Sequence, residues 1–214
     1  MNHEVIRISE ATKKFGNHIV LNNVSAFFES NKIHGIIGRN GSGKTMLFKC
    51  IIGFVPLTSG SIIVNEKTVG KDIDMPDDIG IIIETPGFLP NYSGLGNLKL
   101  LAGLKNTIQK DRILDCMRMV GLDPALRKGV GRYSMGMRQR LGIAQAIMEN
   151  PSVLILDEPM NGLDQHGVSD IRKLLLELKG SGTTILLASH NKDDIETLCD
   201  HVYEMDAGSI TPRR

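Results

Sequence analysis

A stretch of eight residues rich in glycine restricts the fold more than any other feature of this sequence. It covers residues 38–45 (GRNGSGKT) and stands between an apolar, β-branched run at 33–37 (IHGII) and a helical pattern at 46–52. Glycines let the backbone turn sharply so that several N–H groups point inward, and the start of a helix adds a partial positive charge. We therefore expect a strand, an anion-binding loop and a helix in direct succession, as in a parallel α/β sheet.

The same eight residues match the GxxxxGK[ST] pattern of loops that hold nucleotide phosphates. A purely structural turn is the alternative, and the strand before the pattern and the helix after it argue against that alternative. We expect Lys44 to reach the β- and γ-phosphates and assist catalysis there, and the Thr45 hydroxyl to bind Mg²⁺. The residues expected around the phosphates are Gly38, Arg39, Asn40, Gly41, Ser42, Gly43, Lys44 and Thr45.

Short apolar runs alternate with helical patterns along most of the chain, which is typical of βαβ units. The runs at 79–83, 153–156 and 184–188 are expected to be further buried strands, and 201–205 the last strand. Polar residues follow the buried runs, so ligand chemistry should gather at the carboxyl ends of the strands. The pattern predicts an α/β fold with a mainly parallel sheet.

Two regions depart from this alternation. Residues 5–9, 20–28 and 60–69 resemble edge strands with a hairpin turn at Asn65-Glu66, which predicts a small antiparallel sheet. Helical patterns at 98–104 and 108–120 without a strand between them predict a helical insertion. We expect one domain over 1–214, with 1–84 and 150–214 in the α/β core and 85–149 in a helical subdomain.

Composition excludes several classes of function. The 214 residues carry 25 Lys and Arg against 24 Asp and Glu, so a charge-driven partner such as a nucleic acid is not expected. No apolar run approaches the roughly 18 residues that a membrane span needs, and the first residues lack the apolar core of a signal peptide. We expect a cytoplasmic protein. The three cysteines are far apart and are expected to be buried, small apolar side chains.

Two acids follow the apolar run at 153–156. Successive side chains of a strand point in different directions, so Asp157 and Glu158 are suited to two separate tasks. We assign Asp157 to Mg²⁺ and Glu158 to the attacking water as general base. A solvated strand end is the alternative, which the preceding phosphate loop argues against.

The order of these motifs resembles the nucleotide-binding domain of ATP-binding cassette (ABC) ATPases over nearly the whole chain. Residues 133–140 (YSMGMRQR) stand at the place of that family's LSGGQ signature, where Ser134 and Gly136 agree with it. Residues 161–164 (NGLD) resemble the D-loop, which contributes Asp164. His190 stands where the family has a switch histidine that contacts the γ-phosphate, and Phe15 where an aromatic ring stacks on adenine.

The resemblance implies a P-loop NTPase fold with a RecA-like sheet, an antiparallel β subdomain and an inserted helical subdomain. It implies a homodimer, or a pair of ABC subunits, with ATP and Mg²⁺ between the phosphate loop of one subunit and Ser134 and Gly136 of the other. Ser134 and Gly136 would bind the phosphate through the positive end of the helix that they begin. Met135 and Met137 replace the usual glycine and glutamine.

Glu84 stands where the family has a glutamine that contacts the metal. With a glutamate at this position, the sequence resembles the subgroup of ABC ATPases that serves bacitracin- and lantibiotic-type peptide export and immunity. Glu84 is therefore expected to bind Mg²⁺, although an exposed loop acid is the alternative. Residues near 85–105 are expected to contact an integral-membrane permease.

The leading hypothesis is an ATP-hydrolysing subunit, peripheral on the inner face of the cell membrane, that powers a separate permease. The expected cargo is an exported peptide antibiotic, drug or lipid-like substrate. The first alternative is a non-transport ABC ATPase of translation or DNA repair, which would usually add a second cassette or a basic arm. A small-molecule kinase is the second alternative, but it leaves residues 133–140 and His190 without a role.

Overall fold

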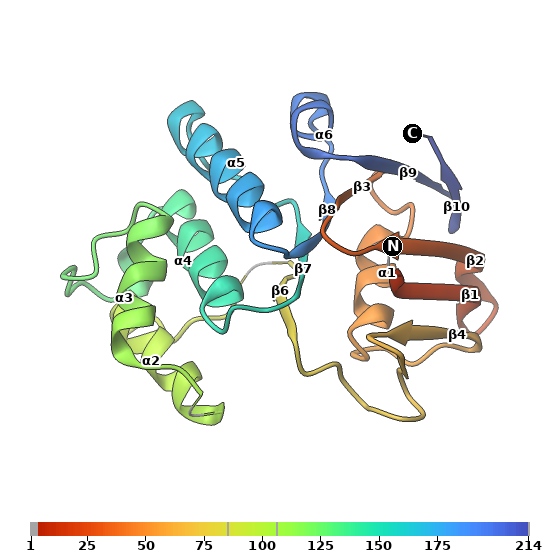
Figure 1. Cartoon of the computed structure of the whole chain (residues 1–214), viewed down its shortest axis with the longest axis horizontal. Coiled ribbons are helices and arrows are strands. Elements are labelled where there is room, and N and C mark those ends of the chain that lie inside the picture. Colours follow the sequence, from red (N-terminus) through yellow and green to blue (C-terminus); the bar gives the residue numbers. More distant parts are fainter. Residues whose placement is uncertain (1–3, 85, 106, 214) are drawn as a thin grey trace.

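The computed structural model of the chain describes residues 4–84, 86–105 and 107–213. Its centre is a six-stranded sheet whose strands run parallel except the last (Figure 1). The apolar runs predicted from the sequence form four neighbouring strands of it. The three inner strands are buried because helices cover both faces of the sheet, and the strand at 79–82, at the edge, is half-buried. The strand order is β10 (Ser209–Pro212), β9 (His201–Asp206), β3 (Ile33–Ile37), β8 (Thr184–Ala188), β7 (Val153–Asp157) and β6 (Ile79–Ile82).

A second, antiparallel sheet lies at one end of the molecule. Its hairpin turn at Asn65-Glu66 has positive φ angles of 46° and 66°, as a two-residue turn of the favoured hand requires, so this prediction is confirmed. Helix α1 (Lys44–Ile51) packs between the two sheets, where Leu47 and Phe48 are fully buried. The strand order is β2 (His18–Glu29), β1 (Glu4–Phe15), β4 (Ser59–Val64) and β5 (Lys67–Thr68).

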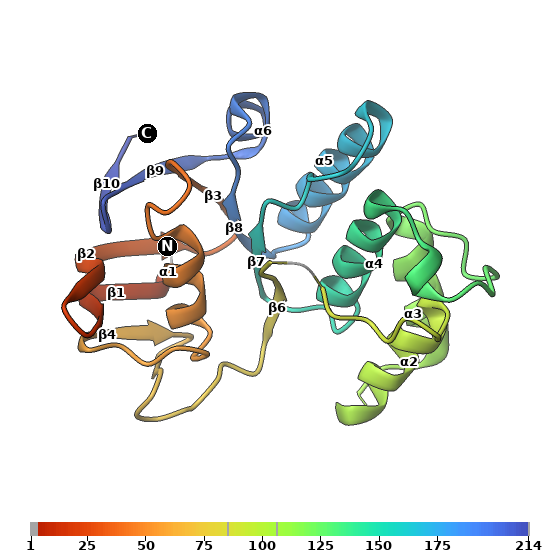
Figure 2. The same ribbon diagram turned by 180° about the vertical axis from the view of Figure 1, so that it is seen from behind.

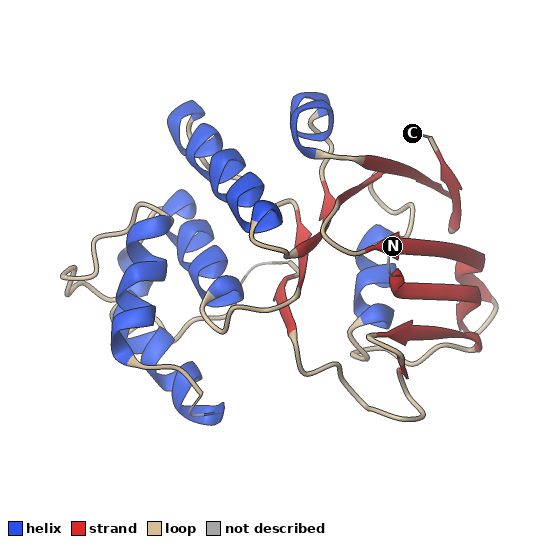
Figure 3. Cartoon of the chain, in the orientation of Figure 1, coloured by secondary structure: helices blue, strands red, loops and turns tan. Residues whose placement is uncertain are grey.

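Helices gather at the opposite end, away from the antiparallel sheet (Figures 2 and 3). They pack through a core cluster that includes Leu98, Met117 and Leu141 and that continues to the main sheet. Helix α5 (Gln165–Gly180) and helix α6 (Lys192–Leu198) follow β7 and β8 in the chain. The helices of the insertion are α2 (Gly94–Lys105), α3 (Lys110–Met119), a short 3₁₀ turn (Val130–Arg132) and α4 (Met135–Ile147).

The α/β fold class is confirmed, and the differences from the predicted elements are local. Strands β1 and β2 are each 12 residues long because they pair with each other along their whole length. Strand β10 and helix α6 were not predicted, since both are short and polar and neither shows a periodic apolar pattern. Strand β10 follows a turn at Ala207-Gly208, where both φ angles are positive, and pairs with β9.

The three cysteines are buried, as the sequence analysis expected, and no disulfide joins them in the described part of the chain. Burial raises the pKa of the Cys50 thiol to about 11, and it raises the pKa of Cys116 as well. A thiol with a raised pKa holds little reactive thiolate at neutral pH. These side chains therefore act as small apolar groups of the core.

A buried ion pair joins α5 to α6. Arg172 donates from Nε (2.9 Å) and Nη2 (2.5 Å) to Oδ1 of Asp194, whose side chain is 1% exposed. Ser189, directly after β8, donates its hydroxyl to Oδ2 of the same carboxylate at 3.0 Å. The pair therefore also fixes the backbone that leads into His190.

We expect Arg172→Met to lower the free energy of unfolding by about 3 kcal/mol, because it leaves the Asp194 carboxylate buried without its cation. Chemical denaturation measures this loss. The matched control is Arg118→Met, which removes an ion pair to Asp115 that is exposed at both ends and costs at most about 1 kcal/mol. Equal losses in the two variants would contradict the structural importance of the buried pair.

Candidate nucleotide-binding site

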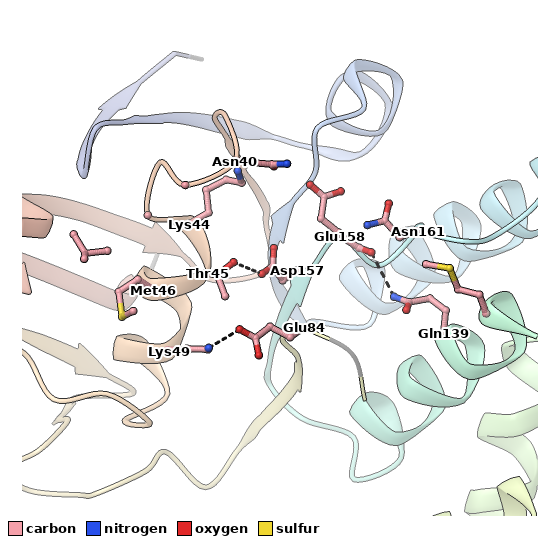
Figure 4. Close-up of a pocket in the computed structure, with 14 residues that line it drawn as sticks. Asn40, Lys44, Thr45, Met46, Lys49, Glu84, Gln139, Asp157, Glu158 and Asn161 are labelled. Atoms are coloured by element: carbon pink, nitrogen blue, oxygen red, sulfur yellow. Dashed lines mark hydrogen bonds and ion pairs between the residues drawn. The ribbon is translucent and has the colours of Figure 1, made fainter. Parts of the chain in front are cut away.

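A pocket of about 590 Å³ opens at the carboxyl ends of the parallel strands. Figure 4 shows its side chains converging from three sides: the loop before α1, the ends of β6 and β7, and the start of α4. The structure thus brings together segments that are far apart in the chain. The predicted residues that line it are Asn40, Gly41, Gly43, Lys44, Thr45, Glu84, Asp157 and Glu158.

The predicted phosphate loop wraps around the ammonium group of Lys44. Lys44 is 7% exposed and donates from Nζ to the carbonyl oxygens of Gly38 (2.7 Å) and Arg39 (3.2 Å). Gly38 has a φ of 152°, and a Cβ there would stand 2.3 Å from the carbonyl oxygen of Met205. Only glycine fits this position, so the close approach of loop and β9 explains that residue. The Ser42 hydroxyl is buried without a hydrogen-bond partner in the described structure.

Thr45, on α1, and Asp157, at the end of β7, contact each other in the wall of the pocket. The Thr45 hydroxyl donates to Oδ2 of Asp157 at 2.6 Å (Figure 4). A hydroxyl and a carboxylate at this separation form the oxygen-rich pair that Mg²⁺ prefers, with further positions left to phosphate and water. These two residues therefore fit the predicted metal. The described residues contain no group of three or more His, Cys, Asp or Glu arranged around a metal position.

Glu158 follows β7 and His190 follows β8, and their side chains lie next to each other. His190 Nδ1 and Glu158 Oε2 are 2.8 Å apart. Glu158 has a φ of 51°, and its backbone is held by the N–H bond to the Ala188 carbonyl (2.9 Å) and by Gln139. Gln139 donates from Nε2 to the carbonyl oxygens of Glu158 (3.4 Å) and Pro159 (3.0 Å). Sequence reasoning missed Gln139, because nothing in its pattern indicates this contact.

Glu84 contacts a lysine in this structure. Its Oε1 lies 2.6 Å from Nζ of Lys49, and its own φ is 61°. Sequence reasoning assigned Glu84 to the metal and gave Lys49 no role. The available signal was spacing, since Lys49 stands four residues after Thr45 and so faces the same side of helix α1.

The signature and D-loop residues begin two helices. The Ser134 hydroxyl caps α4 by accepting the Met137 N–H at 3.2 Å, and the Asp164 carboxylate caps α5 by accepting the Gly167 N–H at 2.9 Å. A Cβ on Gly136 would stand 2.7 Å from the carbonyl oxygen of Gly162, so the signature packs tightly against the D-loop of its own chain. Met135, whose side chain is 58% exposed, lines the pocket.

Phe15 lies at the end of β1, half exposed, with the Lys13 ammonium 4.7 Å from the centre of its ring. From this sheet it is Val20 that lines the pocket, and Phe15 is not among the lining residues. Its role in binding adenine stays a prediction.

None of the helices that the structure describes is long and apolar enough to cross a membrane. The sequence analysis made the same expectation from the lack of a long apolar run.

Comparison with known proteins gives concordant matches. A family model described as ABC transporter matches residues 21–161. YybJ of Bacillus subtilis, an ABC transporter ATP-binding protein, is 43% identical over 96% of this chain and 94% of its own length. The bacitracin transport ATP-binding protein BcrA of Enterococcus faecalis is 40% identical over 96% of this chain and 68% of its own. The lantibiotic transport ATP-binding protein SrtF of Streptococcus pyogenes is 36% identical over 96% and 89%.

Solved structures agree on the fold. A nucleotide-free ATP-binding cassette from an ABC transporter matches 99% of this chain and 92% of its own, with a TM-score of 0.85 and 26% identity. A dimeric cassette in a post-hydrolysis state, bound to ADP and Pi, matches 98% of both chains with a TM-score of 0.88 and 22% identity. The motif order, the strand-end site and these matches show that the chain belongs to the ABC transporter family and is an ATPase.

Proposed function

We propose that this chain binds Mg²⁺ and ATP in the strand-end pocket and hydrolyses ATP to power a separate membrane permease. The observation that carries the proposal is that Thr45, Asp157 and Glu158 line one pocket, where Thr45 contacts Asp157 at 2.6 Å, and that His190, which is not among the lining residues, contacts Glu158 at 2.8 Å. The first pair offers oxygen ligands to a metal, and the second offers a base with a neighbour that orients it. Hydrolysis of a phosphoanhydride needs both.

The roles of the residues follow from their positions. Lys44 would exchange its bonds to loop carbonyls for bonds to phosphate oxygens, since an ammonium group binds a charged phosphate more strongly than a neutral carbonyl. Thr45 and Asp157 would hold Mg²⁺, which when bound neutralises charge on the β- and γ-phosphates. Glu158 would take the proton of the attacking water, and His190 would hold the Glu158 carboxylate in place and reach the γ-phosphate.

We propose that the active form is a head-to-tail dimer. The start of α4, with Ser134 and Gly136, would face the γ-phosphate of ATP held by the other subunit, because a helix N-terminus favours an anion. The exposure of Met135 at this helix start supports a contact with another molecule. In this arrangement Asp164 lies near the junction of the subunits through its place at the start of α5.

The docking surface for the permease is proposed to be an apolar groove between the edge strand β6 and helix α2. It is formed by two pockets of about 370 and 970 Å³ that share Phe54, Ile81 and Leu101. Leu104, 82% exposed, lies at its rim. An apolar surface of this kind is typical of a protein contact. The predicted segment 85–105 contributes α2 to the groove, while Thr85 lies outside the described residues.

The names of the relatives support a proposal for the transported substrate and for the location of the chain in the cell. BcrA and SrtF are named for transport of bacitracin and of a lantibiotic, and we propose peptide-antibiotic export or self-immunity, with drugs or lipid-like molecules as related cargo. The chain would lie in the cytoplasm, on the inner face of the membrane, through its permease. We also propose that 85–149 form the helical subdomain and that the remaining residues form the core. The relatives give no support to a role in translation or DNA repair.

Glu158→Gln is expected to retain ATP binding and to lower the hydrolysis rate at least 100-fold, since the amide cannot accept the proton of water. Phosphate release measures the rate, and size-exclusion chromatography with ATP should detect a stable dimer. An unchanged rate would exclude Glu158 as the base. Glu196→Gln, on the exposed side of α6, is the matched control and should hydrolyse normally.

Ser134→Arg is expected to abolish hydrolysis and to leave binding of ATP to the monomer intact. A long cation at the start of α4 would block the subunit contact while standing outside the chain's own phosphate loop. Hydrolysis is measured at concentrations that allow dimers, and binding by titration at low concentration. Lost binding, or unchanged hydrolysis, would argue against a role for Ser134 in the partner's site.

Leu104→Glu is expected to weaken association with the proposed permease partner at least tenfold, because it places a charge at the rim of the apolar groove. Co-purification from detergent extracts measures the association. Leu176→Glu provides the control, since Leu176 is 38% exposed on α5, outside the groove. Equal recovery of permease with both variants would reject this docking surface.

A further inference from the structure

One ion pair in the nucleotide pocket has no part in the mechanism proposed above. Lys49 and Glu84 lie 2.6 Å apart between Nζ and Oε1, and Figure 4 shows their side chains pointing toward each other from α1 and from the end of β6. Both residues line the nucleotide pocket, and both also line the smaller pocket of the docking groove. The pair therefore forms part of the wall between the two.

Helix α1 contacts two acids with one face. Thr45 and Lys49 are four residues apart, so they lie on the same side of the helix. Thr45 donates to Asp157 after β7, and Lys49 donates to Glu84 after the neighbouring strand β6. The hydroxyl thus faces a proposed metal ligand, and the ammonium faces the acid that stands in the place of a neutral amide.

The charge of Glu84 needs a partner in this position. A carboxylate close to a polyphosphate opposes nucleotide binding unless a cation compensates it. The backbone of Glu84 also has a left-handed φ of 61°, a conformation that persists in non-glycine residues when neighbouring contacts hold it. The Glu84 side chain is 64% exposed and that of Lys49 25%, so the acid is the more accessible partner. An ion pair this exposed contributes little to stability and can be exchanged easily.

We propose that Lys49 is the positioning residue of Glu84: it compensates the carboxylate in the nucleotide-free protein, and the carboxylate exchanges between Lys49 and the Mg²⁺ side of the pocket. This inference rests on the proposed nucleotide site and on the expectation from the sequence that Glu84 contacts the metal. Because the pair also lines the docking groove, the exchange alters a wall that the permease would contact.

A double-mutant cycle tests the pair. Binding of a non-hydrolysable ATP analogue is titrated for the wild type, Lys49→Met, Glu84→Gln and the double variant, once with EDTA and once with Mg²⁺. With EDTA, Lys49→Met should weaken binding about tenfold, because the Glu84 carboxylate then repels the polyphosphate without a compensating cation. The same substitution should change binding less than about twofold when residue 84 is Gln, and Lys49→Arg should bind as the wild type.

Mg²⁺ provides a second comparison, because a metal ion that takes up the Glu84 carboxylate replaces the missing ammonium. The effect of Lys49→Met should then shrink to about twofold or less. Lys179→Met is the matched control: Lys179 is 26% exposed and pairs with Asp200 at 3.2 Å, outside the pocket. Its loss should leave binding unchanged under both conditions, and thermal unfolding verifies that every variant is folded.

Three outcomes would overturn the inference. Equal weakening by Lys49→Met with Glu and with Gln at position 84 would mean that Lys49 acts on the nucleotide directly. No weakening in either background would mean that the pair is a surface contact only, and equal weakening with and without Mg²⁺ would exclude the exchange. A wild-type protein that fails to bind the analogue would instead contradict the proposed nucleotide site itself.

Discussion

Parallel pairing of β3, β8 and β7 is the constraint on which the site depends. In the sheet, Ile36 pairs with Ala188, and Ala188 in turn pairs with Asp157, so all three strands end at the same level. Parallel strands have their carboxyl ends at one edge, where loops and helix N-termini can surround a ligand. This is why Thr45 and Asp157, separated by 112 positions in the chain, come within 2.6 Å of each other. The helices bury the faces of the sheet, and the pocket opens at this edge.

The acids that follow β6 and β7 share a backbone feature. Glu84 and Glu158 both have left-handed φ angles, which cost about 1–3 kcal/mol in a non-glycine residue. Tertiary contacts hold each of them: Lys49 bonds the Glu84 side chain, and Gln139 bonds the carbonyl of Glu158. Both contacts come from helices that begin at the pocket. The conformations of Glu84 and Glu158 therefore depend on where α1 and α4 lie relative to the strand ends.

Much of the fold could be predicted because its strands are continuous apolar runs. Residues 33–37 and 184–188 form strands with the predicted bounds, since a strand buried on both faces needs such a run. The segments at 192–198 and 209–212 could not be predicted, because they are short and polar and exist through contacts with the core. Within the candidate site, the place of the loop at 38–45 before a helix and of the acids 157–158 at the end of a strand could be predicted from local patterns, while their roles stay predictions.

The sequence by itself determined two local structures, the glycine-rich loop between β3 and α1 and the pair of acids at the end of β7. Each depends on residues that are adjacent in the chain, so a local pattern is enough to predict it. Tertiary structure alone decided that Lys49 meets Glu84 and that Gln139 reaches the carbonyl of Glu158. These partners lie 35 and 19 positions apart, and no periodicity links them. The groove formed by Phe54 and Leu101 has the same origin. Such contacts form only when separate helices and strands pack together: helical spacing can place Lys49 on the same side of α1 as Thr45, but it does not identify Glu84 as the partner of Lys49.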